Sequence, residues 1–263
     1  QSQIPNPQSP IPNPHITLSL IQLIIKLIKN IKNLISLINL HYFKKFIKKM
    51  KFTSFLLLFI GISCWFQGVD VSTWDEYIDW GTASQSVYFA IIRAGYGFGH
   101  IDNYYETNYQ NCKANGVKVG AYWYSYASSV SDAEQEAYYI IQALSGKQFE
   151  WPIYYDIEEQ SIFDAGIASD IARAFCSILE ANKYYCGIYS STYFLNTYFD
   201  DDVKTRYTIW LAHWDVEVPT YQGEYDVWQY GSAPVSGIGD DVDVDKGYLD
   251  FEPIMKQYGL NGY

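Results

Sequence analysis

Two carboxylates stand two residues apart at the end of an apolar segment, in Trp151-Pro-Ile-Tyr-Tyr-Asp156-Ile-Glu158-Glu159. Side chains of a β-strand point alternately to its two faces, so Tyr154, Asp156 and Glu158 are predicted to share one face. Because burial and mutual repulsion both disfavour the charged form, the pKa of one of the two acids is expected to be raised. A carboxylic acid that keeps its proton beside an ionised neighbour is what glycoside hydrolysis requires.

The spacing Asp-x-Glu is a weak signal by itself, and its context singles out one pair. Residues 68–263 contain 18 Asp and 11 Glu, so chance alone yields about one such pair. The sequence has four, which are Asp132/Glu134, Asp156/Glu158, Asp215/Glu217 and Asp250/Glu252. Only the second ends an apolar strand, since the others fall in a predicted capping box, in a predicted loop and just before a proline.

Two further acids interrupt apolar strands. Asp70 stands between two valines, and so does Asp243. In a (β/α) barrel, polar residues at the carboxyl ends of strands are typical of catalytic sites. The alternative for each of the two is a structural role, either as a helix cap or as an ion-pair partner of Arg93.

The acidic segment 240–245 partly matches a calcium-binding loop. Counting from Asp241, Asp stands at positions 1, 3 and 5 and Glu252 at position 12. Position 6 of such a loop is Gly, but here it is Lys246, and the alternating valines favour a strand. No Cys-x-x-Cys occurs and only two histidines follow residue 67, which argues against a zinc site. We predict neither a metal nor another cofactor.

Short apolar segments alternate with helical patterns along residues 68–263, as in (β/α) folds. The expected strands are Gly68–Ser72, Phe89–Gly95, Lys118–Tyr126, Pro152–Glu158, Cys186–Ser191, Thr208–His213, Asp226–Gly231 and Val242–Asp245. The expected helices are Glu106–Ala114, a helix from the capping box Ser131-x-x-Glu134 to Leu144, and Asp164–Lys183. Helical patterns fade after about residue 200 while strands continue. The prediction is an α/β fold, an irregular TIM-like (β/α)5(β)3 barrel in a single domain, whose last third lacks proper helices.

Charge divides the chain near residue 67. Residues 1–67 hold eight lysines and no acid, whereas residues 68–263 hold 10 basic and all 29 acidic side chains, a net charge of 10 − 29 = −19. A surface this negative repels a phosphate backbone, which argues against nucleic acid as a partner of the second part.

The sequence from Met50 onward has the pattern of a secretory signal peptide. A short basic start precedes an apolar run from Phe55 to Ile62, with small residues at Gly61 and Ser63 near the expected cleavage site. The run is too short to span a bilayer, which takes roughly 20 apolar residues.

Three segments follow from this pattern. Residues 1–49 are predicted to be a non-native or untranslated upstream segment, 50–67 a signal peptide and 68–263 the catalytic domain. The alternative for residues 17–49 is a basic amphipathic helix on a membrane. The mature domain is expected to have no membrane partner.

Three cysteines follow the predicted signal peptide: Cys112, Cys176 and Cys186. A secreted route permits disulfides, and an odd count leaves one thiol unpaired within the chain. All three pairings stay open at this point, with Cys176 and Cys186 nearest in sequence.

Seven short motifs follow one another along the chain. They are Gly68-Val-Asp70-Val-Ser-x-Trp74, Ile92-Arg93-Ala-Gly-Tyr-Gly97, Gly120-Ala-Tyr122, Pro152-Ile-Tyr-Tyr-Asp156-Ile-Glu158, Trp210-Leu-Ala212, Trp228-Gln-Tyr230 and Val242-Asp243. Together and in this order, they resemble glycoside hydrolase family 25, the CH-type lysozymes or muramidases. The resemblance covers essentially all of residues 68–250, and it implies an irregular barrel with five helix-flanked strands and three later strands.

The resemblance implies hydrolysis of the β-1,4 bond between N-acetylmuramic acid and N-acetylglucosamine, with Glu158 as the general acid. Asp156 is implied to stabilise the developing positive charge or to orient the substrate's N-acetyl group, and Asp70 and Asp243 to complete an acidic floor. The residues implied to bind substrate are Tyr122, Tyr154, Trp210, Gln229 and Arg93. One departure concerns Asp245, which stands where the family usually has Asn and leaves the choice of Asp243 over Asp241 or Asp245 open.

Two alternatives have their own sequence tests. A chitinase-like glycosidase would carry another Asp two residues before Asp156, where this chain has Tyr154. A non-catalytic barrel that binds peptidoglycan or chitin would lack one of the acids. We therefore expect a secreted or lysosomal/phagosomal enzyme that acts as a monomer on peptidoglycan glycan strands, in digestion of bacteria or defence against them.

Overall fold

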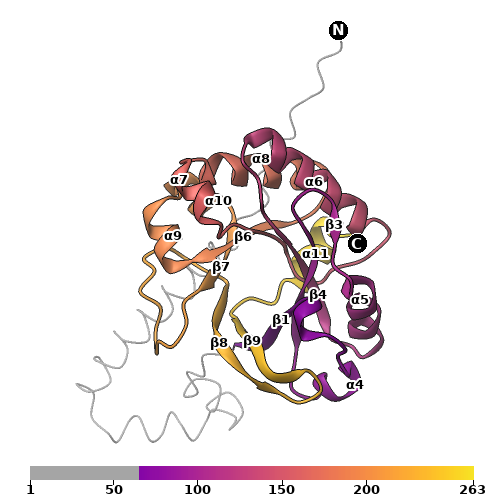
Figure 1. Ribbon diagram of the computed structural model, residues 1–263. Helices are drawn as coiled ribbons and strands as arrows, with labels where there is room; N and C mark the ends of the chain where they lie inside the picture. The colour runs from indigo at the N-terminus through magenta and orange to yellow at the C-terminus, as the bar shows by residue number, and fades with distance from the viewer. Residues whose placement is uncertain (1–64) are drawn as a thin grey trace, which may run out of the picture. The chain divides into compact units, whose positions relative to one another are not determined.

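Eight strands close into a barrel within Trp65–Tyr263, the residues that the computed structural model describes (Figure 1). The barrel strands are β1 (Phe66–Val71), β2 (Phe89–Tyr96), β4 (Lys118–Tyr124), β5 (Ile153–Asp156), β6 (Cys186–Ser191), β7 (Thr208–Ala212), β8 (Val227–Val235) and β9 (Gly239–Gly247). The short β3 (His100–Ile101) pairs with the end of β2. The expectations for residues 1–49 and for most of 50–67 lie outside the described residues.

The pairing of the strands makes the barrel irregular in the predicted way. Neighbours run parallel from β1 through β2, β4, β5, β6 and β7 to β8. In contrast, β9 runs antiparallel to both β8 and β1 and closes the barrel between them. The carboxyl ends of the parallel strands therefore meet at one rim, where such barrels place their active sites.

Helices and single turns connect the strands, and a last helix follows β9. They are η1 (Thr73–Asp75), α4 (Trp80–Ala83), α5 (Tyr105–Ala114), α6 (Val130–Leu144), α7 (Gln160–Asp164), α8 (Ala168–Ala181), α9 (Thr192–Thr197), α10 (Asp201–Arg206) and α11 (Glu252–Tyr258). Among the described residues, none of these helices has the length and apolar character needed to cross a bilayer.

The structure corrects three expectations about helices. The predicted helix Asp164–Lys183 is shorter than expected: α8 begins only at Ala168, because Asp164 still belongs to α7 and Gly166 between the two helices has a left-handed φ of 70°. Ser129, not Ser131, caps α6, and its side chain accepts a hydrogen bond from the Asp132 N–H. The last third of the chain does contain helices, α10 and α11, which are too short to produce a clear periodic pattern.

The domain begins slightly before the predicted boundary at residue 68. Phe66 and Gln67 already belong to β1, where they pair with Gly247 and Lys246 of β9. The Phe66 ring also stacks on Tyr88, with ring centroids 4.5 Å apart.

The two faces of β5 separate the barrel interior from the helical layer, as the alternation predicts. On the outer face, Tyr155 stacks on Phe175 of α8 with ring centroids 3.8 Å apart. On the inner face, the Tyr154 ring packs on the Trp210 ring with centroids 5.3 Å apart. Both tyrosines are buried, so β5 holds Asp156 in a densely packed setting.

Aromatic rings fill the barrel below the rim. Phe89 stacks on Trp151 at a centroid distance of 3.6 Å. A Cβ at Gly68 would lie only 2.0 Å from the Phe89 ring, and one at Gly247 would lie 2.2 Å from Trp151. Glycine on β1 and β9 is therefore what allows these rings to occupy the interior.

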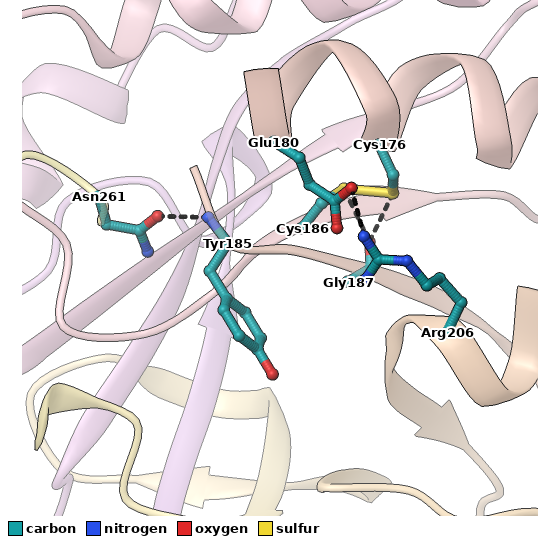
Figure 2. Close-up of a disulfide and its surroundings, with 7 residues drawn as sticks. All are labelled: Cys176, Glu180, Tyr185, Cys186, Gly187, Arg206 and Asn261. Carbon is teal, nitrogen blue, oxygen red and sulfur yellow. Dashed lines mark hydrogen bonds and ion pairs between the residues drawn. A yellow bond between two sulfur atoms is a disulfide. The ribbon is translucent and has the colours of Figure 1, made fainter. Parts of the chain in front are cut away.

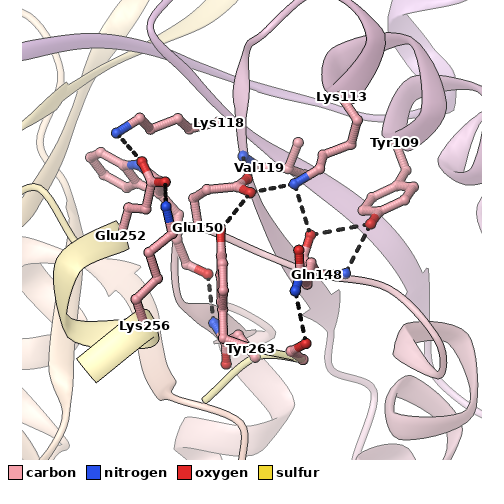
Figure 3. A network of polar contacts seen from close by, with 12 residues as sticks. Tyr109, Lys113, Lys118, Val119, Gln148, Glu150, Glu252, Lys256 and Tyr263 are labelled. Carbon is pink, nitrogen blue, oxygen red and sulfur yellow. Dashed lines mark hydrogen bonds and ion pairs between the residues drawn. The ribbon is translucent and has the colours of Figure 1, made fainter. Parts of the chain in front are cut away.

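The C-terminal residues close the end of the barrel opposite to the rim. Glu150 accepts hydrogen bonds from the Val119 N–H at 3.0 Å and the Tyr263 hydroxyl at 2.9 Å, and it pairs with Lys113 (Figure 3). Nearby, Lys118 of β4 pairs with Glu252 of α11 at 2.6 Å. These contacts tie the last residues of the chain to the start of β4.

Asn261 joins three segments at the same end. Its side chain accepts from the Tyr185 N–H at 2.7 Å, as Figure 2 shows, and donates to the Trp151 carbonyl at 2.9 Å. Its backbone N–H donates to the Lys183 carbonyl, and its carbonyl accepts from the Phe149 N–H. The fully buried Asn261 thus satisfies backbone groups that would otherwise lack partners.

One disulfide connects α8 to β6. Cys176 and Cys186 are bonded (Figure 2). Cys112 is a buried free thiol. This resolves the three pairings that the sequence leaves open. A cross-link that closes a loop this short stabilises a protein by about 2–4 kcal/mol, chiefly through the unfolded state.

Candidate active site

A cleft of about 700 Å³ opens at the carboxyl ends of the parallel strands. Its charged lining residues are Asp70, Asp75, Arg93, Asp156, Glu158, Asp241 and Asp243. Its aromatic lining residues are Trp74, Tyr122, Tyr124, Tyr189, Trp210 and Trp214, and the remainder are Val71, Ser72, Gln229 and Ser232. Six carboxyl groups and one guanidinium make this cleft suited to stabilising positive charge that develops in a bound molecule.

Asp156, at the end of β5, is the most deeply buried acid of the lining. Only 4% of the residue is exposed, and its Oδ1 has no hydrogen-bond partner among the described residues. Burial raises the pKa of Asp156 well above its usual range, the Glu158 charge raises it further, and the Arg93 guanidinium lowers it.

Glu158 follows two residues later and lies at the mouth of the cleft. Much of its side chain is exposed, but its carboxyl lies in the wall of the cleft, where desolvation raises its pKa. The nearby Tyr124 hydroxyl, which donates to Glu159 Oε1 at 2.7 Å, lowers the pKa of Glu158, and the charges of Glu159 and Asp243 raise it. Asp156 at the end of β5 and Glu158 just beyond it therefore differ in access to solvent, while both bind protons more tightly than usual.

Gln229 of β8 fixes the orientation of Asp70. The amide oxygen of Gln229 accepts from the Tyr189 hydroxyl and from the Trp214 indole N–H, both at 2.9 Å. Since both contacts to the oxygen come from donors, the amide nitrogen must point the other way, where it donates to Asp70 Oδ2 at 2.8 Å. Asp70 is thereby held in the barrel floor, and desolvation raises its pKa well above the usual range.

Three acids of β9 form a series from solvent to interior. Asp241 is exposed, Asp243 is half-buried and Asp245 is fully buried. Desolvation raises the pKa of Asp243 to about 6, with contributions from the charges of Asp75 and Asp241. Asp243 lines the cleft, as expected, whereas Asp245 lies beneath the lining and accepts a hydrogen bond from Trp210.

Arg93 of β2 pairs with Asp102 rather than with Asp70 or Asp243. Its Nε and its Nη2 both lie 2.8 Å from Asp102 Oδ2. The Asp102 carboxylate also accepts from the Thr73 N–H and the Tyr104 N–H, each at 2.9 Å. Asp102 therefore holds both the Arg93 guanidinium and the loop after β1 in position.

Trp210 forms the centre of the aromatic packing at the floor of the cleft. The centroid of its ring lies 5.8 Å from the centroid of the Tyr122 ring and 4.5 Å from that of the Tyr189 ring. Tyr154 packs on the far side of Trp210, is fully buried and does not belong to the lining. The expectation that Tyr154 lines the groove is thus wrong. The Tyr154 side chain faces the barrel interior, as the strand alternation predicts, but it lies below the residues that line the cleft.

Eight of the nine residues that the sequence predicts for the site line this one cleft. They are Asp70, Arg93, Tyr122, Asp156, Glu158, Trp210, Gln229 and Asp243. The sequence analysis misses Asp75, Asp102, Tyr189 and Trp214. Tyr189 could have been found from the alternation of the strand Cys186–Ser191, while the others lie in connecting segments that carry no such pattern.

A second cleft of about 640 Å³ adjoins the first. The two share Glu158, Tyr189 and Trp214 in their linings, and the second adds polar side chains of α9 such as Asn196 and Thr197. Glu158 therefore stands between two hollows, an arrangement that suits a chain-like molecule lying across it.

A comparison with known families identifies the chain. The model of glycosyl hydrolases family 25 matches residues 69–238. The chain belongs to this family.

Individual proteins similar to this chain include two that are named as lysozymes. The chain is 30% identical over 192 residues to the uncharacterized protein YegX of Escherichia coli K12, covering 67% of each chain. It is 26% identical over 197 residues to Lysozyme M1 of Streptomyces globisporus, covering 68% of this chain and 67% of that protein. A solved structure, the autolysin LytC of Streptococcus pneumoniae with a synthetic peptidoglycan ligand, is 26% identical with a TM-score of 0.60, and the alignment covers 71% of this chain and 47% of LytC.

Membership of family 25 confirms the predicted family and the predicted (β/α)5(β)3 barrel. The protein is accordingly a glycoside hydrolase. Enzymes of this class mostly use carboxyl groups, one as the proton donor to the leaving oxygen. Within residues 65–263, no group of three or more His, Cys, Asp or Glu side chains is placed to hold a metal ion.

Proposed function

We propose that this protein is a secreted lysozyme, an N-acetylmuramidase that hydrolyses the β-1,4 bond between N-acetylmuramic acid and N-acetylglucosamine in bacterial peptidoglycan. The observation that carries the proposal is the pair Asp156 and Glu158 at the end of β5, both in one cleft and both with raised pKa values. The similarity to Lysozyme M1 and to LytC supports peptidoglycan as the substrate.

Glu158 is the proposed general acid. Its raised pKa keeps a fraction of the carboxyl protonated at mildly acidic pH, so it has a proton to donate to the leaving glycosidic oxygen. Because Glu158 lies between the two clefts, a glycan strand that occupies both brings one of its bonds to this carboxyl.

Asp156 is proposed to act in its ionised form. Arg93 lies close enough to lower its pKa, and the developing positive charge of the sugar ring favours the carboxylate further. In this state Asp156 stabilises the positive charge directly, or it orients the N-acetyl group of the substrate as an internal nucleophile. Asp70 and Asp243 add negative charge to the floor of the same cleft.

Aromatic and amide groups are proposed to hold the sugar rings. Tyr122 and Trp210 present ring surfaces to the cleft, and apolar ring faces suit the C–H faces of sugars. Gln229 and Arg93 add hydrogen-bonding groups whose positions are fixed by their own partners. We propose these four residues as the substrate-binding set.

The enzyme is proposed to be secreted, or to enter a lysosomal or phagosomal lumen, through a signal peptide within residues 50–67, and to act as a monomer. The disulfide Cys176–Cys186 is consistent with an oxidising route. Because β1 begins at Phe66, we expect cleavage after the small residues Gly61 or Ser63 rather than after Gln67, which would remove two residues of a barrel strand. Intact-mass analysis of the native protein tests this, and a mature chain that retains residues before Met50 would contradict it.

Clearing of a turbid suspension of bacterial cell walls tests the activity. The purified protein should clear the suspension, and Glu158→Gln should reduce the rate by about 10²-fold or more, the usual contribution of a general acid. Glu134→Gln is the matched control, since Glu134 is an exposed residue of α6 and lines neither cleft. Binding of walls without clearing would favour a non-catalytic barrel, and cleavage of chitin instead of walls would favour a chitinase-like glycosidase.

A further inference from the structure

Asp245 is a buried acid that lies directly beneath the proposed active site and is not part of its lining. The residue is 0% exposed. Its Oδ1 accepts from the Trp210 indole N–H at 2.7 Å, while its Oδ2 is buried and has no hydrogen-bond partner among the described residues. A buried carboxylate oxygen without a donor is costly, so the structure around Asp245 calls for an explanation.

The nearest candidate partner is another acid. Asp245 pairs in register with Gly68 of β1, two residues before Asp70, and the two carboxyls lie close enough that each shifts the pKa of the other. The other titratable groups that face it are Asp243 on its own strand and Tyr154 of β5. Within the described part of the chain, no lysine or arginine forms an ion pair with Asp245.

Two carboxyl groups in contact, without a cation, repel each other when both are ionised and attract when they hold one proton between them. The donor to Asp70 from the opposite side is already fixed, because Gln229 is oriented by Tyr189 and Trp214. A proton on the Asp245–Asp70 pair would give the unpartnered oxygen of Asp245 its hydrogen bond. Such a pair titrates as a unit rather than as two separate acids.

We propose that Asp245 is a positioning residue that shares one proton with Asp70 and holds this acid in place, and that loss of the shared proton sets the alkaline limit of activity. The inference rests on the proposed glycosidase function. In agreement with it, desolvation and the Asp243 charge raise the pKa of Asp245 to about 7. Above that range both carboxylates are charged, and their repulsion displaces Asp70 and the Trp210 ring that Asp245 holds.

The test is Asp245→Asn in the full chain, with the rate of cell-wall hydrolysis measured across pH. Asn keeps an oxygen for Trp210 and offers Asp70 a permanent N–H donor, so it imitates the protonated acid at every pH. The alkaline limb of the pH–rate profile should move up by about one unit or more, while the rate near about pH 5 stays within about threefold of the parent. Asp240→Asn removes a charge from the outer, exposed side of the same strand and should leave the limb in place.

A second measurement needs no substrate. A buried acid with a folded-state pKa of about 7 stabilises the fold at pH values below its pKa in the unfolded state, and this stabilisation is lost as the pH rises through about 7. The melting temperature of the parent protein should therefore fall as the pH is raised to about 7. Asp245→Asn should flatten this fall. An unchanged limb and an unchanged slope of melting temperature against pH would overturn the shared proton. If the parent protein does not hydrolyse cell walls at all, the proposed function is refuted. The slopes of melting temperature against pH would still show whether Asp245 and Asp70 share a proton.

Discussion

Asp102 provides a stringent test of how the cleft is held together. Its side chain is 0% exposed, it pairs with the 11% exposed Arg93, and it also accepts two backbone N–H groups. Asp102→Asn keeps the size but removes the charge and one acceptor. Breaking a buried ion pair from one side costs about 3–5 kcal/mol, and we expect the lower end, about 3 kcal/mol, because Asn retains one accepting oxygen.

The assay is thermal unfolding by calorimetry. For a domain of this size, about 3 kcal/mol corresponds to a fall in melting temperature of roughly 6–12 °C. Asp202→Asn is the control, since it breaks an Arg–Asp contact of similar length, 2.7 Å to Arg173, but at an exposed site. Exposed pairs contribute about 0–1 kcal/mol. Equal effects of the two substitutions would refute the reasoning that burial makes Asp102 important.

Three further outcomes are expected. Asp156→Asn should lower cell-wall hydrolysis by about 10²-fold or more yet raise the melting temperature, because it replaces a buried acid, whose charged form burial disfavours, with a neutral amide. Asn261→Ala should destabilise the fold by about 3 kcal/mol or more in urea unfolding, since two buried backbone groups lose partners and Ala disfavours the positive φ of this position. Raised pKa values of Asp243 and Asp245, about 6 and about 7, predict that the melting temperature falls as pH rises through these values; a rise instead would contradict the buried-acid account.

The sequence predicts the fold and most of the cleft because period-2 patterns survive in short strands. Asp70, Asp156 and Asp243 each interrupt an apolar strand, and a charge in such a position is hard to explain except at a site. The same reasoning places Tyr154 on the correct face of β5. The alternation does not show how deep along the barrel axis Tyr154 lies, because that depends on its packing against Trp210.

Contacts between distant segments are the part that sequence patterns do not contain. Asp102 lies in the segment between β3 and α5, and nothing in its neighbours indicates that it binds Arg93 and the loop after β1. The orientation of Gln229 likewise depends on Tyr189 and Trp214, 40 and 15 residues away. Such networks arise from the closed barrel, which brings the carboxyl ends of its parallel strands to one rim.

The most direct test of the central claim is the chemistry of the reducing ends released from peptidoglycan. Mass spectrometry after borohydride reduction distinguishes muramitol from glucosaminitol. The proposed cleavage predicts that the purified protein generates muramitol ends and that Glu158→Gln generates them at least about 10²-fold more slowly. New glucosaminitol ends, or muramitol ends formed equally fast by Glu158→Gln, would contradict the assignment of this cleft as an N-acetylmuramidase site with Glu158 as its acid.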